Sequence, residues 1–317
     1  MLYCVTGCAG FIGSHMVDCL LEQGHDVIGI DNFSTGLHPF LDHAKQSPRF
    51  KLITGDLQDP SVATKAIQHV DAVFHFAANA DVRWGTHYPH KDLEQNTIVT
   101  FNVLEAMRAN QIQKIAFAST GSIYGEATIF PTPEHAPFPI QTSLYGASKL
   151  AAEGFIQAYC EGFGCQAYIF RFVSILGERY THGHVFDFYK QLLQHPEQLQ
   201  ILGNGKQRKS YLYVKDCIDA ILFAMKHATE KVNIFNLGTD EYCQVDDSIN
   251  WICHYLNRIP ERIYTGGERG WIGDNPFIFL DCSKIRKLGW KPTLSIQQGV
   301  VQTIDFLKHN TWIVEQR

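Results

Sequence analysis

Long apolar runs, an excess of basic residues and metal-binding cysteine spacings are all missing from this sequence. No stretch approaches the roughly 18–20 apolar residues that cross a bilayer, so we expect no membrane-spanning segment. The formal net charge is -5 at pH 7, which gives no electrostatic attraction to nucleic acid or to an anionic membrane surface. We therefore predict no nucleic-acid partner and no membrane partner.

The nine cysteines are irregularly spaced, and none of them forms a CxxC pair. Such spacings match no zinc site, and an odd number of cysteines in a long chain is typical of free thiols. The N-terminal residues MLYCVTGCAG have neither the basic segment nor the long apolar run of a secretion signal. We therefore predict no metal site, reduced cysteines and a cytoplasmic protein.

The sequence does contain enough apolar residues for a large core. Hydrophobic residues make up 45% of the 317 positions and charged residues 19%, an ordinary balance for a folded globular protein. In the first half, short runs rich in Val, Ile, Phe and Tyr alternate with segments of helical spacing. The expected strands are Leu2–Thr6, Val27–Ile30, Phe50–Thr54, Ala72–Phe76, Ile115–Ser119 and Ala167–Phe172. The expected helices are Gly13–Gln23, Val62–His69, Leu93–Asn110 and Tyr145–Gly162.

This alternation predicts an α/β fold with a doubly wound, Rossmann-like parallel sheet that helices cover on both faces. After about residue 175 the rhythm changes. We predict a dinucleotide-binding domain over residues 1–175 and a smaller mixed substrate domain over 176–317, of which some segments could return to the sheet. The ligands would lie between the two, at the carboxyl ends of the parallel strands. In the second part we expect helices at 184–194, 215–227, 245–256 and 296–308, and strands near 199–202, 210–214, 233–236 and 262–264.

Three glycines follow the first expected strand with the spacing GxxGxxG, at Gly7, Gly10 and Gly13. A strand that turns sharply towards a pyrophosphate needs positions without side chains, and the next helix offers N–H groups and a positive dipole end. The alternative is an ordinary tight turn. Asp31 ends the second strand, 18 residues after Gly13, where a carboxylate can accept hydrogen bonds from the adenosine ribose and would repel a 2′-phosphate. The pattern therefore predicts NAD rather than NADP.

Tyr145 and Lys149 lie four residues apart at the start of an expected helix, so they stand on the same face. A nearby ammonium stabilises a phenolate and lowers the pKa of the tyrosine. The tyrosine can then take a proton from a sugar hydroxyl while a hydride leaves the same carbon. The preceding strand leads into two hydroxyl residues, and we expect Thr120, with Ser122 as second choice, to hydrogen-bond the reacting oxygen. The alternative for either hydroxyl is a role in the turn.

Five segments of the chain form one larger pattern: TGCAGFIGSH, DNFSTG, ASTGSIYG, YGASK and SYLYVKDC. Together they resemble the extended short-chain dehydrogenase/reductase family, over a range from Val5 to about Pro292. Within that family the chain most resembles NAD-dependent sugar-nucleotide epimerases of the UDP-glucose 4-epimerase type. The resemblance implies a nucleotide-diphosphate sugar as substrate and a homodimer formed through the helices near 93–109 and 145–162.

The resemblance also implies a role for each site residue. It gives Tyr145 the acid/base role and Thr120 the supporting hydroxyl, and it places Lys149 on the cofactor. Asp56 would meet the adenine amine. The implied cofactor contacts, in addition to the glycines and Asp31, are Phe11, Ile12, Asn32, Ser34, Thr35, Gly36, Asp56, Leu57, Phe76, Ala77, Ala78 and Ala80.

Residues near Thr120 favour one reaction of this family. In its epimerases a hydride leaves C4 of the sugar for the bound NAD+ while the tyrosine takes the hydroxyl proton. The 4-keto sugar then turns over, and the hydride returns to its opposite face. The family's 4,6-dehydratases carry Asp-Glu where this chain has Gly121 and Ser122, and decarboxylating members keep the Glu. Because epimerisation needs neither acidic group, these two residues favour an epimerase.

The positions that would bind the nucleotide sugar match the family less closely. Ser174 stands where the family usually has Asn, and Lys209 where it usually has Arg. Arg269 resembles the family's second phosphate-binding Arg, and Asp274 could meet the nucleotide ribose. We expect the segment Gly177–Phe186 to border the sugar. The sequence names neither the sugar nor the base.

Several alternatives stay open. On the same scaffold they are a uronate 4-epimerase, a 2-epimerase and a 4-keto-sugar reductase. A different class is a nucleotide-sensing protein that kept the fold and lost the chemistry, but such a protein would be expected to lose Tyr145 or Lys149, and both are present. For the basic run Lys206–Lys209 the alternative is a solvated turn.

Overall fold

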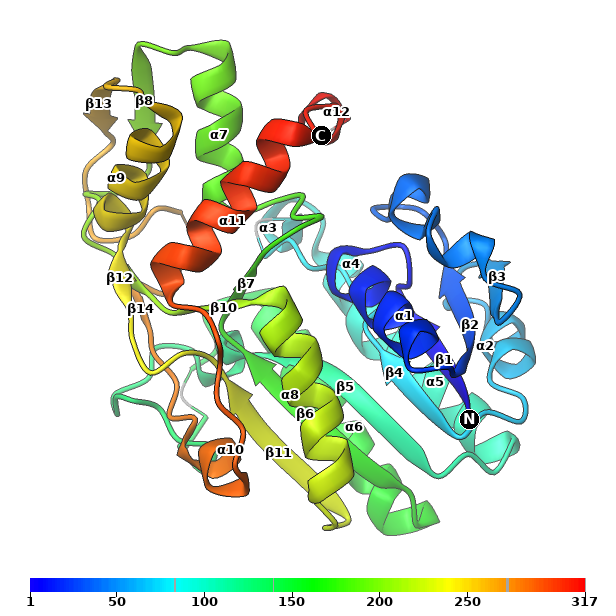
Figure 1. The fold of residues 1–317 in the computed structure, drawn as a ribbon. Helices are drawn as coiled ribbons and strands as arrows, with labels where there is room; N and C mark the ends of the chain where they lie inside the picture. The colour runs from blue at the N-terminus through cyan, green and yellow to red at the C-terminus, as the bar shows by residue number, and fades with distance from the viewer. Residues whose placement is uncertain (83, 139, 272–273, 317) are drawn as a thin grey trace. The chain divides into compact units, whose positions relative to one another are not determined.

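The computed structural model describes residues 1–82, 84–138, 140–271 and 274–316 of the chain (Figure 1). The chain divides into two compact units, each assembled from separate segments. The first unit consists of Met1–Ile123, Ser143–Arg171 and Ile218–Phe235, and the second of Tyr124–Thr142, Phe172–Cys217 and Asn236–Arg317. Residues 218–235, far beyond residue 175, thus belong with the N-terminal part of the chain.

A seven-stranded sheet forms the centre of the first unit, in the order β11-β6-β5-β4-β1-β2-β3. β1 pairs in parallel with β2 and β4, β2 with β3, and β4 with β5. An order of 3-2-1-4-5-6 is that of a Rossmann fold, so the predicted fold class is confirmed. The strands are β1 (Leu2–Thr6), β2 (Asp26–Asp31), β3 (Phe50–Thr54), β4 (Ala72–His75), β5 (Lys114–Thr120), β6 (Gln166–Phe172) and β11 (Val232–Leu237).

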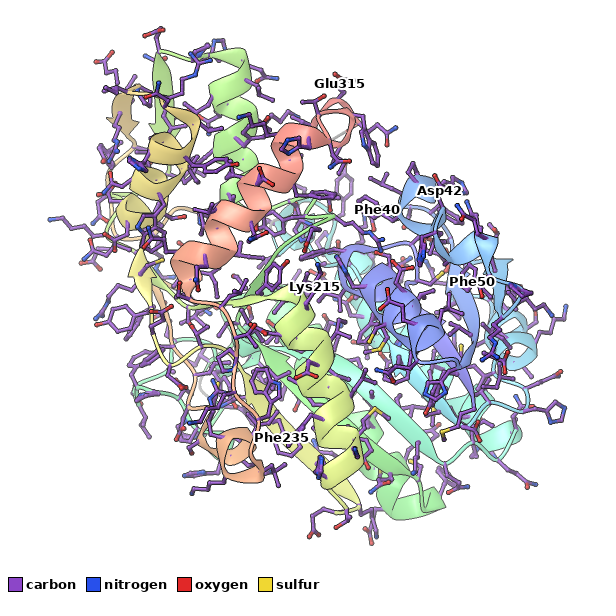
Figure 2. All side chains as sticks on the ribbon, in the orientation of Figure 1. Phe40, Asp42, Phe50, Lys215, Phe235 and Glu315 are labelled. Carbon is purple, nitrogen blue, oxygen red and sulfur yellow. The ribbon has the colours of Figure 1, made fainter. Side chains whose placement is uncertain are left out.

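Helices cover both faces of this sheet. They are α1 (Phe11–Glu22), α2 (Pro60–Ala66), α5 (Val99–Ala109), α6 (Leu144–Phe163) and α8 (Val214–His227). Figure 1 shows α1 and α8 in front of the sheet and α5 and α6 behind it. The central strands are nearly continuous apolar runs because both faces are buried, and all four residues of β4 are buried. At the end of the sheet Phe235, labelled in Figure 2, stacks on Phe170 with 6.2 Å between ring centroids.

The chain between β4 and α5 forms short helical turns. α3 (Trp84–His87) and α4 (Pro89–Asp92) lead into a π-helix, η3 (Leu93–Ile98), which continues into α5. The prediction of one α-helix over Leu93–Asn110 was therefore wrong for its first six residues. Residue periodicity does not separate a π-helix from an α-helix over so short a segment. Three 3₁₀ turns were also not predicted: η1 (His38–Leu41), η2 (Ala44–Gln46) and η4 (Gly121–Tyr124).

The helix that carries Tyr145 and Lys149, α6, has a defined start and end. Ser143 caps its N-terminus, because its side-chain oxygen accepts a hydrogen bond of 3.0 Å from Gly146 N. Gly164 ends the helix in the left-handed conformation, with φ 73°. These two caps define where α6 begins and ends.

The second unit is made of short strand pairs and helices. β7 (Ser174–Leu176) pairs with β10 (Tyr211–Tyr213), and β8 (Gln198–Ile201) pairs with β13 (Glu261–Tyr264). β9 (Arg208–Lys209) lies between β12 (Cys243–Gln244) and β14 (Phe277–Ile278). The helices are α7 (His184–Gln194), α9 (Val245–Leu256), α10 (Ser283–Leu288), α11 (Ile296–His309) and α12 (Trp312–Glu315). The sequence predicted α7, α9 and α11, as well as β8, β10 and β13. It missed the shorter elements α10, α12, β7, β9, β12 and β14, which are too short to show a period.

Within the described ranges, no helix is both long and apolar enough to cross a membrane. Among the same residues, no group of three or more His, Cys, Asp or Glu side chains is placed to hold a metal ion. The nine cysteines are free thiols, and eight of them are buried.

Candidate active site

Close backbone contacts shape the turn between β1 and α1. Gly7 has φ 67°, and a Cβ at this position would lie 2.8 Å from Ala77 N. A Cβ at Gly13 would lie 2.8 Å from the carbonyl carbon of Gly7. Gly7 N donates a hydrogen bond of 2.8 Å to Ile30 O, which ties the turn to β2. Only glycine fits at Gly7 and Gly13, because a side chain at either would push the turn away from the strands.

Gly10 is the N-cap of α1, and no side chain caps this helix end. The first turn of α1 also contains no acidic residue. The N–H groups at a helix start lack partners within the helix and carry a partial positive charge. The start of α1, with Phe11 and Ile12, is therefore suited to an anionic group such as a pyrophosphate.

Asp31, at the end of β2, connects the glycine turn to the loop that follows. Its Oδ2 accepts a hydrogen bond from Ala9 N and its Oδ1 from Phe33 N, both at 2.8 Å. Burial raises the pKa of the Asp31 carboxyl, although the two N–H donors act in the opposite direction. Each carboxylate oxygen has a second lone pair. Asp31 can therefore still accept hydrogen bonds from ribose hydroxyls, and its charge disfavours a 2′-phosphate.

The other predicted cofactor residues lie in the loops at the same edge of the sheet. Asn32 donates a hydrogen bond of 2.9 Å to Asp56 Oδ2, which joins the ends of β2 and β3. Phe76 N and Ala77 N donate to the Thr6 hydroxyl at 3.2 and 3.1 Å, which joins the ends of β4 and β1. The residues that the structure places in these loops and at the start of α1 are Gly7, Gly10, Phe11, Ile12, Gly13, Asp31, Asn32, Ser34, Thr35, Gly36, Asp56, Leu57, Phe76, Ala77, Ala78 and Ala80.

The four predicted catalytic residues meet at the end of β5. The Thr120 hydroxyl faces the phenol of Tyr145 and lowers its pKa. Thr120 Oγ1 also donates to Ser122 Oγ at 3.2 Å and accepts from Ser122 N at 3.1 Å. Lys149 Nζ donates a hydrogen bond of 2.9 Å to the carbonyl oxygen of Ala118. α6 and β5 together thus present a phenol, an ammonium group and two hydroxyls.

The titration of Tyr145 differs from the sequence prediction. Burial raises its pKa to about 12; the Thr120 hydroxyl lowers this pKa, and the charge of Asp92 raises it further. Burial lowers the pKa of Lys149 to about 7, while the charges of Glu153 and Asp92 oppose that change. The pKa of Tyr145 therefore lies above its ordinary value and not below it, contrary to the prediction, because burial disfavours the phenolate.

A buried polar network beside α6 was missed in the sequence. Asn79 Nδ2 donates to Asp92 Oδ1, and Asn79 N donates to Asn96 Oδ1, both at 2.8 Å. Asn96 Nδ2 donates to Ser148 Oγ at 2.9 Å, and Ser148 Oγ donates to the carbonyl oxygen of Tyr145 at 2.9 Å. A usable signal was the spacing of Asp92 and Asn96, which lie four residues apart and interrupt an otherwise regular segment.

The predicted nucleotide-sugar residues belong to the second unit. Lys209 Nζ donates a hydrogen bond of 2.8 Å to Asp274 Oδ1, and Asp274 Oδ2 accepts one of 2.9 Å from a backbone N–H. Both oxygens of this buried carboxylate therefore have partners within the chain. Arg269 forms an ion pair with Glu126. Ser174 is exposed at the start of β7.

The segment Gly177–Phe186 ends in the first turn of α7 and contains a half-buried histidine, His184. Its Nε2 lies 2.8 Å from Ser248 Oγ, and its ring centroid lies 4.8 Å from that of Tyr211. Burial, with a contribution from the charge of Lys209, lowers the pKa of His184 to about 3. The histidine is therefore neutral at physiological pH.

The chemistry of the first unit fits NAD. The uncapped start of α1 at Gly10 suits a pyrophosphate, and the Asp31 carboxylate suits an unphosphorylated ribose. A Cβ at Gly7 or Gly13 would close the turn that a dinucleotide has to approach. Lys149 adds a donor at the end of β5, where a nicotinamide ribose could be held.

Comparison with known proteins agrees with this geometry. The sequence profile of the NAD dependent epimerase/dehydratase family matches residues 3–238. The chain is 34% identical over 313 residues to a Methanocaldococcus jannaschii protein that carries the name UDP-glucose 4-epimerase provisionally, and the alignment covers 96% of this chain and 98% of that protein. The alignment therefore spans nearly the full length of both chains.

Two crystal structures of epimerases are similar over nearly the whole chain. One, of a UDP-galactose 4-epimerase, has a TM-score of 0.89 and 36% identity, and it covers 98% of this chain and 100% of the other. The second, of a Bacillus cereus UDP-glucuronic acid 4-epimerase with UDP-glucuronic acid and NAD, has a TM-score of 0.88 and 27% identity, with the same two coverages of 98% and 100%. The chain belongs to the NAD dependent epimerase/dehydratase family.

Proposed function

We propose that this protein is an NAD-dependent epimerase that inverts C4 of the sugar in a nucleotide-diphosphate sugar, through a 4-keto intermediate. The observation that carries the proposal is the meeting of Tyr145, Thr120 and Lys149 at the end of β5. The loop that contains Asp31 lies at the same edge of the sheet. The similar proteins named as 4-epimerases support the same reaction, and the NAD in the Bacillus cereus structure supports the cofactor.

The side chains at the end of β5 have complementary roles in this reaction. Tyr145 Oη takes the proton of the sugar C4 hydroxyl and later returns it. Thr120 donates a hydrogen bond to the same oxygen and, through Ser122, keeps its own orientation. NAD, held by the first unit, would supply the hydride chemistry at C4.

Lys149 supplies the charge that this proton transfer needs. A tyrosine with a pKa of about 12 is a poor base at neutral pH. An ammonium group near the phenol favours the phenolate and so lowers that pKa. The reaction therefore depends on keeping Lys149 protonated although burial brings its pKa to about 7.

The two positions after Thr120 support epimerisation rather than elimination. Gly121 has no side chain, and Ser122 offers a hydroxyl that is already hydrogen-bonded to Thr120. Elimination of water from the sugar would need a positioned carboxylic acid or carboxylate there. Neither position supplies one.

We further propose that Lys209 and Arg269 of the second unit bind the diphosphate. Both are paired with carboxylates, Asp274 and Glu126 respectively. An incoming diphosphate would compete with these carboxylates for the two cations. The role of Asp274 towards a nucleotide ribose then requires that its bond to Lys209 opens. Ser174 is our remaining candidate for a contact with the nucleotide sugar.

We also propose a homodimer formed through α5 and α6. Four large apolar side chains on η3, α5 and α6 are 38–55% exposed: Ile98, Phe101, Phe155 and Phe163. Phe101 and Phe155 touch each other edge to face, with ring centroids 6.0 Å apart. Exposed large apolar side chains gathered on neighbouring helices in this way are typical of a protein–protein contact.

A cytoplasmic location stays a prediction from the sequence.

The proposed function can be tested with a panel of nucleotide sugars. Purified protein would be incubated, without added cofactor, with UDP-glucose, UDP-glucuronic acid, UDP-N-acetylglucosamine and the GDP- and dTDP-linked hexoses. We expect a C4 epimer of at least one sugar and no net change in reduced NAD. Absence of any C4 epimer would overturn the proposal, and stoichiometric consumption of added NADH would identify a reductase instead.

A further inference from the structure

Two oppositely charged side chains lie in the interior of the first unit, and one of them is one helical turn beyond Lys149 on α6. Arg171 on β6 is 2% exposed and Glu153 on α6 is 0% exposed. Arg171 Nε lies 3.1 Å from Glu153 Oε1, and Arg171 NH2 lies 2.7 Å from Glu153 Oε2. The guanidinium therefore holds the carboxylate with two parallel hydrogen bonds, a geometry that fixes orientation as well as distance.

A third residue joins this pair to the strand of the active site. Ser119 Oγ donates a hydrogen bond to Glu153 Oε1. Ser119 lies between Ala118, whose carbonyl oxygen accepts the hydrogen bond from Lys149, and Thr120. The Glu153 carboxylate thus links α6, β5 and β6 near the end of β5, which carries Thr120.

The spacing along α6 places this carboxylate in line with the catalytic pair. Tyr145, Lys149 and Glu153 follow one another at intervals of four residues, so they stand on one face of the helix. Glu153 is one turn beyond Lys149, and its charge opposes the loss of the Lys149 proton. The phenol, the ammonium and the carboxylate form one row.

Stability alone does not account for the buried pair. Removing two charges from water costs several kcal/mol per ion, and well-packed apolar residues of similar volume often stabilise a fold equally well. An apolar pair at these two positions would leave Lys149 without the nearest charge on its own helix. The pair therefore has a role other than stability, and its position beside Lys149 indicates that this role is in the active site.

The charged and titratable groups around Lys149 come from several elements. Tyr145 and Glu153 lie on α6, Arg171 lies on β6 against Glu153, Asp92 ends α4, and His75 ends β4. His75 is neutral, because burial and the charge of Lys149 bring its pKa to about 3. The two carboxylates, Glu153 and Asp92, are the groups that favour a charged Lys149.

We propose that Glu153 is a positioning residue for the epimerase reaction. Arg171 and Ser119 hold its carboxylate, which keeps a negative charge one helical turn from Lys149 and fixes the end of β5 that carries Thr120. The inference rests on the proposed function and extends it, because it assigns a role to a residue that touches neither sugar nor cofactor.

The test compares the titration of Lys149 in the intact protein and in Glu153→Gln. In protein labelled with ¹³C-lysine, the Cε signal of Lys149 reports its protonation, and Lys149→Met identifies that signal. We expect Glu153→Gln to lower the midpoint by one pH unit or more, a tenfold change in proton affinity. In turnover assays the alkaline limb of kcat should move to lower pH, with KM for the sugar changed less than twofold.

Three further variants separate this role from a merely structural one. Glu153→Asp keeps the charge and should return the midpoint of Lys149 towards the wild-type value. Glu153→Gln/Arg171→Met removes both buried charges, so it folds even if Glu153→Gln alone does not, and it should still show the lowered midpoint. Glu161→Gln, an exposed residue of α6 paired with Lys231, should leave the midpoint unchanged.

The outcomes are distinct. An unchanged midpoint of Lys149 in Glu153→Gln or in the double variant overturns the positioning role. An equal shift in Glu161→Gln overturns it as well, since any charge on α6 would then suffice. If the wild-type protein epimerises no sugar, the proposed function fails, but the titration of Lys149 can still be read, so the two failures are distinguishable.

Discussion

Lys149 Nζ donates a hydrogen bond of 2.9 Å to the carbonyl oxygen of Ala118, two residues before Thr120 on β5. This contact ties α6 to the end of the strand. The same lysine therefore holds the strand end and supplies charge to Tyr145, so the position of the ammonium group and the position of the threonine are coupled. Substitutions near this contact are the most direct tests of the site.

Tyr145→Phe removes the phenol oxygen and little else. We expect kcat to fall by about 10²–10⁴-fold, the usual contribution of a positioned acid/base group. Bound NAD should be retained, because none of the proposed cofactor contacts involves that oxygen. The measurements are turnover and NAD content per chain. Tyr255→Phe, which removes a hydroxyl bonded to Asp305 in the second unit, should keep full turnover. Loss of NAD from Tyr145→Phe would show that the assigned role is wrong.

Asp31→Asn should weaken NAD binding and reduce the preference for NAD over NADP. An amide cannot accept from Ala9 N and Phe33 N and also offer two charged acceptors to a ribose. A hydrogen bond to a charged group contributes about 1.5–3 kcal/mol, which corresponds to roughly a tenfold to hundredfold loss of affinity. Isothermal titration of cofactor-free protein with both dinucleotides gives the ratio.

The matched control for this change is Asp42→Asn. Asp42, labelled in Figure 2, lies just after η1 in the same unit and pairs with the exposed Lys45 at 3.6 Å. Its replacement should leave both dissociation constants unchanged. Equal loss of affinity in the two variants would assign the effect to net charge and not to the site.

The turn and the strand ends were predictable because their signals are local. Gly7 and Gly13 lie in one short segment, and β5 is a continuous apolar run that leads to Thr120. The charge state of the site was not predictable, because it depends on burial. The spacing of Tyr145 and Lys149 shows that they share one face of the helix. Only the packed structure shows that burial raises the pKa of Tyr145 and lowers that of Lys149.

Polar pairs between residues far apart in the chain could not be predicted from the sequence either. Lys209 and Asp274 are separated by 65 positions, and no periodicity connects them. Arg171 and Glu153 lie on a strand and a helix whose register is set by packing. The π-helix η3 was missed because its residues have the same composition as an α-helix. In each case the missing information is a tertiary contact.

Asp274→Ala should destabilise the protein by about 3–5 kcal/mol, because it leaves the mostly buried ammonium of Lys209 without its partner. Chemical denaturation gives the free energy of unfolding. Lys209→Met/Asp274→Leu removes both charges and should lose much less stability than the single change. The exposed pair Lys231–Glu161 is the control, and its loss should cost less than about 1 kcal/mol. A double variant as unstable as Asp274→Ala would argue against an electrostatic cause.

Phe101→Glu should convert a dimer into a monomer. Phe101 is 38% exposed on α5 and touches Phe155 on α6, so a carboxylate there would be buried in the proposed contact. Light scattering after size exclusion should show the mass fall from two chains to one. Ile259→Glu changes a side chain that is 97% exposed in the second unit, and it should leave the mass unchanged. A wild-type protein with the mass of one chain would contradict the proposed dimer.

Two histidines with lowered pKa values, the buried His75 and the half-buried His184, should make stability depend on pH. Burial lowers the pKa of His75 to about 3, from an ordinary value of 6.5. Its two ring nitrogens are hydrogen-bonded to the hydroxyls of Thr6 at 2.7 Å and Thr100 at 3.0 Å. The unfolded chain therefore binds a proton between these two pH values that the folded chain does not. His75 contributes its full stability above pH 6.5 and loses it progressively as the pH falls towards 3.

The size of this effect follows from the two pKa values. At pH 5 the loss from His75 is about 2 kcal/mol relative to pH 7.5, and His184, whose pKa is also about 3, should contribute a similar loss. Denaturation series at pH 7.5, 6 and 5 should therefore show a shallower decline in His75→Gln than in the wild type. His195→Gln changes an exposed histidine and should keep the wild-type slope. If His75→Gln declines as steeply as the wild type, His75 does not remain neutral in the fold, and Lys149 has one more cation beside it.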